Sequence, residues 1–318
     1  MERVEEIVSR YFKVENVFHL EDGFEFEVYS ENYKDSFRKL YSDVTKEGYV
    51  PKLIKRGSKV LLSVTRLKEE KTKPNYISIV LLLASLGTII LDGYYKIGYY
   101  NQYLLAYEAP VLALLVIHEG VRRLVSFLKR TKPTTTYAIP GYPGIIPFMG
   151  FITTRTNSPI NLDDLFDETF YPLAAALAGT LAFLLISPKV NLTFPKPINL
   201  PFFYQIFSSY INRNNAIFEG LALSVTILFI NFLPGTNLDG GVLISGVKGN
   251  SFVFDLISII IMSFLGYFIL ALMIIILQNM AYRVEVLDSV SPLSRDRRII
   301  YYCAFAVVTL LFLLLGTF

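Results

Sequence analysis

The spacing of apolar residues divides the chain into two parts that meet near residue 73. In the first part, apolar positions recur at helical spacing and then alternate as in strands. This pattern predicts a helix up to Phe12, strands over 14–19 and 24–29, a helix over 33–47, and two further strands around Gly57. We therefore expect residues 1–73 to form a small soluble α+β domain with the order α-β-β-α-β-β.

Beyond residue 73 the pattern changes to long apolar runs that carry few charges. A run of about 20 residues, at a rise of about 1.5 Å per residue, crosses a hydrocarbon core about 30 Å thick. The sequence predicts six membrane spans, at residues 74–91, 104–126, 170–188, 220–238, 256–282 and 299–318. Residues 74–318 are therefore expected to form a polytopic α-helical membrane domain.

Two long connections separate these runs. Residues 133–160 contain five prolines and three glycines among apolar residues, too broken for a helix and too apolar for a solvated linker. We expect a re-entrant or interfacial hairpin there, because irregular backbone is tolerated at membrane depth only where protein or water covers it. Residues 189–217 are expected to form a long loop on the outer face.

Charge and composition agree with a membrane protein. Charged residues make up 18% of the chain, and 29 of its 57 Asp, Glu, Lys and Arg residues lie within residues 1–73. This distribution excludes a soluble enzyme, a secreted disulfide scaffold and a disordered protein. A net charge of +3 gives no argument for nucleic acid, and a single cysteine allows no intrachain disulfide. Membrane lipid is the expected partner.

Lysine and arginine predict the orientation of the spans. Four basic residues precede the first span and five follow the second, so both ends and the N-terminal domain should face the cytoplasm. Six simple crossings would instead place Arg295, Arg297 and Arg298 outside. Either the fifth run is not a simple span, or the positive-inside bias fails at this position.

Two groups of residues are candidates for chemistry. His118 and Glu119 lie toward the cytoplasmic end of the second span, where ionisable residues are costly and usually functional, although a position near the helix end could be merely interfacial. The fourth span ends in a break at Pro234 and Gly240, with Asn231 and Asp239 beside it. A simple helix end with a turn does not explain a carboxylate so close to the hydrocarbon.

The sequence resembles the site-2 protease family of zinc intramembrane metalloproteases. That family carries H-E-x-x-H on one span and N-x-x-P-x-x-x-L-D-G on a later one, and the second motif matches at Asn231, Pro234, Leu238, Asp239 and Gly240. Supporting stretches are residues 158–160, 165–167 and 292–295, and one branch of the family begins with an α+β domain. The resemblance therefore covers nearly the whole chain.

The resemblance implies roles for these residues. His118, a second histidine and Asp239 would bind zinc, Glu119 would be the general base, and Asn231 would give polar support. Imidazoles at positions i and i+4 share a helix face and can hold one metal ion. Zinc would then polarise a peptide carbonyl and activate a water molecule. The substrates implied are transmembrane segments of other proteins.

The second histidine of the motif is replaced by Arg122, and the only other histidine of the chain, His19, lies in the soluble domain. A catalytic zinc requires three protein ligands, and a guanidinium cannot be one of them. The run Tyr171–Ala175 also departs from the Gly-Pro-x-Ala-Gly-like run of the family. We predict an ion pair between Arg122 and Asp239 in place of zinc; the alternative is that Arg122 extends to the cytoplasmic interface.

Three functional hypotheses remain. The first is a non-hydrolytic member of a site-2-protease-like fold that binds or regulates membrane proteins. The second is an active zinc endopeptidase with an altered ligand set, in which Glu119 or another group completes the site. The third is a transporter, because broken helices at membrane depth also mark transport sites.

Overall fold

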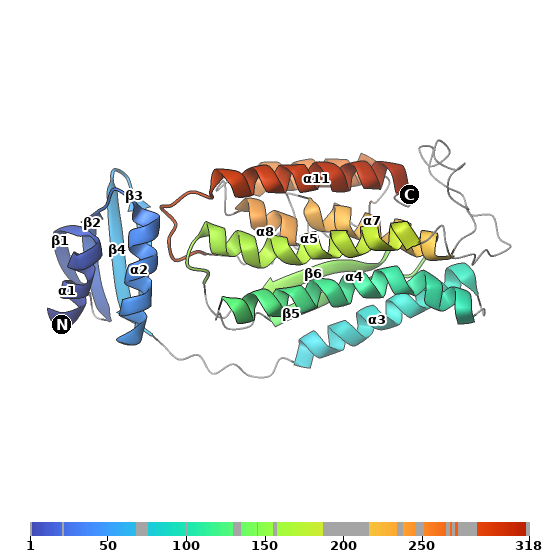
Figure 1. The fold of residues 1–318 in the computed structure, drawn as a ribbon, viewed down its shortest axis with the longest axis horizontal. Helices are drawn as coiled ribbons and strands as arrows, with labels where there is room; N and C mark the ends of the chain where they lie inside the picture. Colours follow the sequence, from blue (N-terminus) through green and yellow to red (C-terminus); the bar gives the residue numbers. More distant parts are fainter. Residues whose placement is uncertain are drawn as a thin grey trace.

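The computed structural model describes most of the chain. The described residues are 2–20, 22–67, 76–98, 101–129, 135–144, 146–154, 158–186, 216–233, 238–245, 251–264, 268, 271–272 and 285–315. Their elements form a small mixed unit at one end of a larger bundle of helices (Figure 1). The loop expected over 189–217 lies outside the described residues except at Ala216 and Ile217, and so does Pro234.

The N-terminal unit has the predicted order of elements. They are α1 (Glu2–Tyr11), β1 (Lys13–Leu20), β2 (Gly23–Tyr29), α2 (Tyr33–Lys46), β3 (Tyr49–Arg56) and β4 (Lys59–Arg66). The strands pair antiparallel in the order β1-β2-β4-β3. Alternate residues of β2 and β4, such as Phe26 and Leu62, bury against Val8 of α1 and Phe37 of α2. The period of two in the strands and the amphipathic helices therefore meet in one core.

The remaining elements form the helical bundle. They are α3 (Tyr76–Ile97), α4 (Asn101–Leu128), β5 (Thr135–Tyr142), β6 (Ile146–Thr154), α5 (Leu162–Ile186), α7 (Ala216–Phe232), α8 (Asp239–Ser245), α9 (Ser251–Phe264) and α11 (Arg295–Leu315). Among the described residues, four helices are long and apolar enough to cross a membrane: Tyr76–Ile97, Gln102–Leu128, Leu162–Ile186 and Arg295–Leu314. These helices indicate a membrane protein. Helix α7 has 17 residues, all buried, and is the centre of the bundle.

The bounds of several helices differ from the predicted spans. Helix α5 begins at Leu162, eight positions before the expected residue 170, because the carboxylates of its first turns are paired with cations. Helix α7 ends at Phe232, and a separate short helix follows from Asp239. Helix α9 begins at Ser251 and is described only to Phe264, so the second half of the fifth run lies mostly outside the described residues.

The hairpin expected over 133–160 is present as the antiparallel pair β5–β6. It begins and ends at the end of the bundle where α4 stops and α5 starts, and its turn reaches far along α3. There Gly144 N donates a hydrogen bond of 2.6 Å to Asp92 Oδ1, five residues from the end of α3. Thr88 Oγ1 donates to Pro147 O at 2.7 Å. The bundle thus supplies hydrogen-bond partners for backbone groups of the hairpin that lipid tails could not satisfy.

The N-terminal unit joins the bundle by strand pairing. Leu53 N on the outer edge of β3 donates to Leu287 O at 2.7 Å, and Ser289 N donates back to Leu53 O at 3.0 Å. The same segment pairs on its other side, where Asp288 N donates to Ile160 O at 2.7 Å. Leu287 is buried in the core of the N-terminal unit. The sheet therefore continues into the two segments that lead into α5 and α11.

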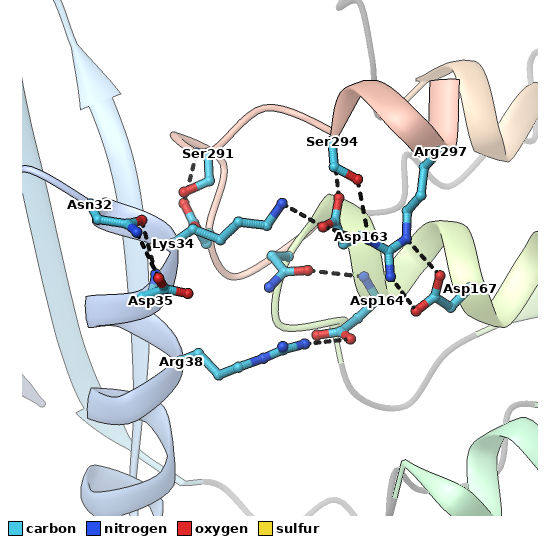
Figure 2. Close-up of polar contacts among 12 residues, drawn as sticks. Asn32, Lys34, Asp35, Arg38, Asp163, Asp164, Asp167, Ser291, Ser294 and Arg297 are labelled. Atoms are coloured by element: carbon cyan, nitrogen blue, oxygen red, sulfur yellow. Dashed lines mark hydrogen bonds and ion pairs between the residues drawn. The ribbon is translucent and has the colours of Figure 1, made fainter. Parts of the chain in front are cut away.

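A network of ion pairs, which we call the docking cluster, lies beside this junction (Figure 2). Its members are Asp163, Asp164 and Asp167 of α5 with Lys34 and Arg38 of α2, Lys129 after α4, and Arg297 of α11. Lys34 contacts Asp163 at 2.5 Å and Arg38 contacts Asp164 at 2.9 Å, which ties the N-terminal unit to α5.

Arg297 makes the most contacts in the docking cluster. Its Nε and Nη2 donate to the two oxygens of Asp167 at 2.7 and 2.9 Å, and its Nη1 donates to Asp163 Oδ2 at 2.8 Å. Lys129 adds contacts to Asp164 and Asp167 at 2.9 and 2.8 Å. The first two turns of α5 therefore hold α4, α11 and the N-terminal unit at one end of the bundle.

This geometry bears on the position of the basic residues near 295. Tyr301 OH of α11 donates to Phe232 O at 3.0 Å, so α7 ends where α11 begins. Phe232, the last residue of α7, and Arg295, the first residue of α11, therefore lie toward the same end of the bundle.

We expect Arg297→Ala to lower the melting temperature, because Asp163 and Asp167 would lose charged partners in a nearly buried site. The bidentate contact is worth about 2 kcal/mol, or a fall of about 4 °C in a chain of this size. Thermal unfolding in detergent measures the shift. Arg298→Ala is the matched control, because Arg298 is exposed on the same turn. Equal shifts for the two variants would show that the docking cluster adds nothing to stability.

Candidate functional site

His118, Arg122 and Asp239 meet in the interior of the bundle. His118 and Arg122 lie one turn apart on α4, and Asp239 is the first residue of α8. Arg122 Nη2 donates to both Asp239 oxygens at 2.8 Å, and His118 Nε2 lies 2.7 Å from Asp239 Oδ2. The three residues are 2%, 4% and 1% exposed. The predicted ion pair is present, and Arg122 does not extend to the interface.

The hydrogen bonds at His118 indicate its tautomer. Nε2 cannot both donate to Asp239 and accept from Arg122 Nη2, which lies 3.3 Å away. The shorter contact is to Asp239, so we assign the proton to Nε2 as a donor to the carboxylate. Nδ1 is buried and has no hydrogen-bond partner among the described residues, as suits the bare nitrogen of a neutral ring. In this tautomer Nε2 has no lone pair for another group.

The hairpin strand β6 forms one wall of the site. The ring of Phe151 stacks on the imidazole of His118, with centroids 4.5 Å apart and planes at 4°. Asn231 Nδ2 of α7 donates to Met149 O at 3.2 Å and to Ile227 O at 2.7 Å. Asn231 thus supports the strand, and its contacts do not include His118 or Asp239.

Two glycines allow the close packing around the site. A Cβ at Gly150 would lie 2.1 Å from Asn231 Oδ1, and the φ of Gly150 is +124°. A Cβ at Gly240 would lie 2.5 Å from the carbonyl carbon of Phe232. Gly240 therefore lets α8 approach the end of α7, and this approach brings Asp239 into contact with His118 and Arg122 of α4.

Glu119, the predicted general base, points elsewhere. Consecutive residues on a helix are about 100° apart, so Glu119 leaves the face that carries His118. Glu119 Oε1 accepts from Arg123 Nε at 2.9 Å, an exposed pair on the side of α4. Its other oxygen is buried, and no described residue makes a hydrogen bond to it. The structure joins His118, Arg122 and Asp239 but does not bring Glu119 to them.

The residues present do not fit a catalytic zinc ion. Such an ion needs three protein ligands and an open position. Here Arg122 donates to both oxygens of Asp239, and its charge would repel a dication at the same place. In the part of the chain that the structure describes, no three His, Cys, Asp or Glu side chains gather as a metal site. What this arrangement can do is clamp α8 against α4 by charge.

A second buried polar group was not predicted. Tyr107 OH of α4 donates to Asp92 Oδ2 of α3 at 2.5 Å, and Lys96 lies 3.3 Å from the same oxygen. Asp92 also accepts from the backbone of Gly144. This group fixes the turn of the hairpin to α3 and α4. Asp92 and Lys96, at i and i+4 near the end of an apolar run, were the signal available in the sequence.

We expect Arg122→Ala to destabilise the protein strongly, because Asp239 would remain buried with only a neutral imidazole beside it. Breaking a buried pair in this way costs about 3–5 kcal/mol, and a drop of at least about 6 °C in melting temperature should follow. Arg123→Ala is the control, because its exposed pair with Glu119 is worth at most about 1 kcal/mol.

The double variant Arg122→Met, Asp239→Leu distinguishes an ion pair from simple packing. Removing both charges leaves no unpaired buried charge, and only the neutral Nε2–H of His118 loses its partner, so the double variant should be more stable than either single variant. Additive losses in this cycle would contradict the clamp.

Comparisons with known proteins were negative. The chain matches no family model, no curated protein and no solved structure. The likeness of the Asn231–Gly240 motif to the site-2 proteases remains a resemblance.

Proposed function

We propose that this chain is a multi-pass membrane protein with a site-2-protease-like core that binds transmembrane segments of other proteins without hydrolysing them. The observation that carries the proposal is Arg122, whose guanidinium occupies both oxygens of Asp239 beside His118. We call the contacts of Arg122 and His118 with Asp239 the clamp. The clamp keeps the positions of a metallopeptidase site, but a fixed cation fills the place of the metal. Glu119, turned away toward Arg123, is not available as a base.

The proposed topology has about six membrane segments, with the N-terminal unit in the cytoplasm. Four are the long apolar helices, and α7 is the fifth. Because α7 ends near the start of α11, the run that begins with α9 is the sixth segment and is proposed to enter and leave the membrane at that one end. The docking cluster supports one cytoplasmic end, because it brings Lys129 and Arg297 together with Lys34 and Arg38 of the N-terminal unit. A shared end for these cations agrees with the positive-inside rule.

A groove between α4 and α5 supports the binding of a transmembrane segment. It is open, about 450 Å³ in volume, and is lined by Val121, Val125, Leu128, Lys129, Tyr171, Ala174 and Ala175. Its lining is almost wholly apolar, and Ala174 and Ala175 let another backbone approach closely, as small residues do between membrane helices. The departure of this run from the family pattern thus provides a surface for a partner helix.

Zinc content tests whether the clamp has replaced the metal. Arg122→His restores the spacing of two imidazoles one turn apart, with Asp239 as a third ligand. We expect about one zinc per chain in purified Arg122→His and none in the unmodified protein, by elemental analysis after dialysis. Adding His118→Ala to Arg122→His should abolish the zinc. Stoichiometric zinc in the unmodified chain, lost on His118→Ala, would instead support a peptidase with an altered ligand set.

Photocrosslinking tests the groove. A benzophenone amino acid in place of Tyr171, which lines the groove and is 48% exposed, should crosslink to transmembrane segments of other proteins in native membranes. Tyr302 on α11 is the matched control, because it is 59% exposed and lies outside the groove. Mass spectrometry of the products should find peptides from membrane spans at Tyr171 only. Lipid adducts alone, or the same products at both positions, would contradict the proposal.

A further inference from the structure

Strand β1 is a free edge of the N-terminal sheet as far as the described residues show. The strand order β1-β2-β4-β3 leaves two edges, and the β3 edge is already paired with residues 287–289 of the same chain. Figure 1 shows β1 on the side of the sheet that faces away from the helical bundle. An edge strand presents a row of unpaired N–H and C=O groups. The sheet therefore pairs with an added segment at its β3 edge, while no described segment pairs with its β1 edge.

Exposed apolar side chains accompany this edge. Val17, Phe18 and Leu20 are 39%, 51% and 45% exposed. The register places Val17 opposite Phe26, on the face that carries the helices, and Phe18 opposite Glu25, on the other face. An added strand would thus find apolar neighbours on both of its faces, and cross-strand contacts of this kind stabilise a sheet.

The edge is also acidic, although the chain as a whole carries +3. Residues 13–29 contain five carboxylates and one lysine. Glu27 is paired with Lys59, whose contact lowers the pKa of that carboxyl. Neither Glu15 nor Glu25 has a cation partner in the described part of the chain. The charge therefore favours a basic ligand at the open edge.

The position of the edge decides between occupants. The β3 edge faces the bundle through the segment that leads into α11, so β1 is the strand farthest from it along the sheet (Figure 1). Two copies in the same membrane are related by a rotation axis along the membrane normal. Both β1 edges would then point away from the bundle in the same direction, so they could not pair with each other. An extended segment that arrives from the aqueous phase can reach the edge without this restriction.

We propose that β1 binds an extended protein segment with alternating apolar and basic residues, which adds to the sheet as a fifth strand. The pairing runs along Asn16–Leu20, because an irregularity between Val14 and Asn16 interrupts the regular edge. The backbone supplies the hydrogen bonds. On the face that carries the helices, Val17 contacts the apolar side chains of the added strand. On the other face, the basic side chains extend across Phe18 and Leu20 toward Glu25. This binding goes beyond the proposed function and does not depend on it.

The test measures binding of a fluorescent nine-residue peptide of alternating valine and lysine to the full chain in nanodiscs of neutral phospholipid. Anisotropy should rise with the chain present and not with empty nanodiscs. Two control peptides, one with glutamate for lysine and one with proline at the central positions, should not bind, because they reverse the charge or remove the N–H donors. Any binding should weaken as salt rises.

Variants locate the contact. Phe18→Ser with Leu20→Ser should weaken binding about fivefold, the loss of about 1 kcal/mol of cross-strand contact. Leu67→Ser, at a residue that is 49% exposed on the same unit, should leave it unchanged. Likewise Glu25→Gln should weaken binding and Glu31→Gln should not. Unchanged melting temperatures show that the variants fold.

Three results would overturn the proposal. One is the absence of binding by the alternating peptide. Another is equal binding by the proline peptide, which would show that backbone pairing is not involved. The third is a dimer of the unmodified chain in nanodiscs that Phe18→Ser with Leu20→Ser dissociates, since a second copy would then occupy the edge.

Discussion

The ion pair between Arg122 and Asp239 is the interaction on which the interior of the bundle depends. Two charges removed from water cost several kcal/mol each, and their attraction compensates only when the contact is close and the remaining polar atoms are satisfied. Here the guanidinium reaches both carboxylate oxygens and His118 donates to one of them. This contact requires close packing at two glycines: Gly240 lets α8 lie against the end of α7, and Gly150 lets β6 lie against Asn231.

Ion pairs also determine which helices of the bundle pack against one another. Within lipid there is little hydrophobic gain when two apolar helices meet, so polar contacts and close packing decide the partners. Arg122 joins α4 to α8, Lys129 joins α4 to α5, and Arg297 joins α5 to α11. All three cations lie toward the end of the bundle that carries the N-terminal unit, and each contacts an aspartate.

The sequence predicted the elements well and some of the contacts. Periodicity found the order of the N-terminal unit and the hairpin, and the i, i+4 spacing of His118 and Arg122 placed both on the face that meets Asp239. The start of α5 was missed, because Asp163 and Asp167 look like loop residues until Arg297 is brought to them by the fold. The role expected for Glu119 came from the resemblance alone, and in the structure Glu119 pairs with Arg123, away from His118 and Asp239.

The pairing of Leu53 with residues 287–289 has a consequence for the order in which the protein is made. Ser289 lies 236 positions after Leu53, its hydrogen-bond partner. At about 5–20 residues per second, a ribosome needs about 10–50 s to travel between them. The N-terminal unit emerges first, yet the β3 edge of its sheet stays open while nearly every apolar helix is synthesised. Closure of that edge can therefore occur only once synthesis has reached the final helix.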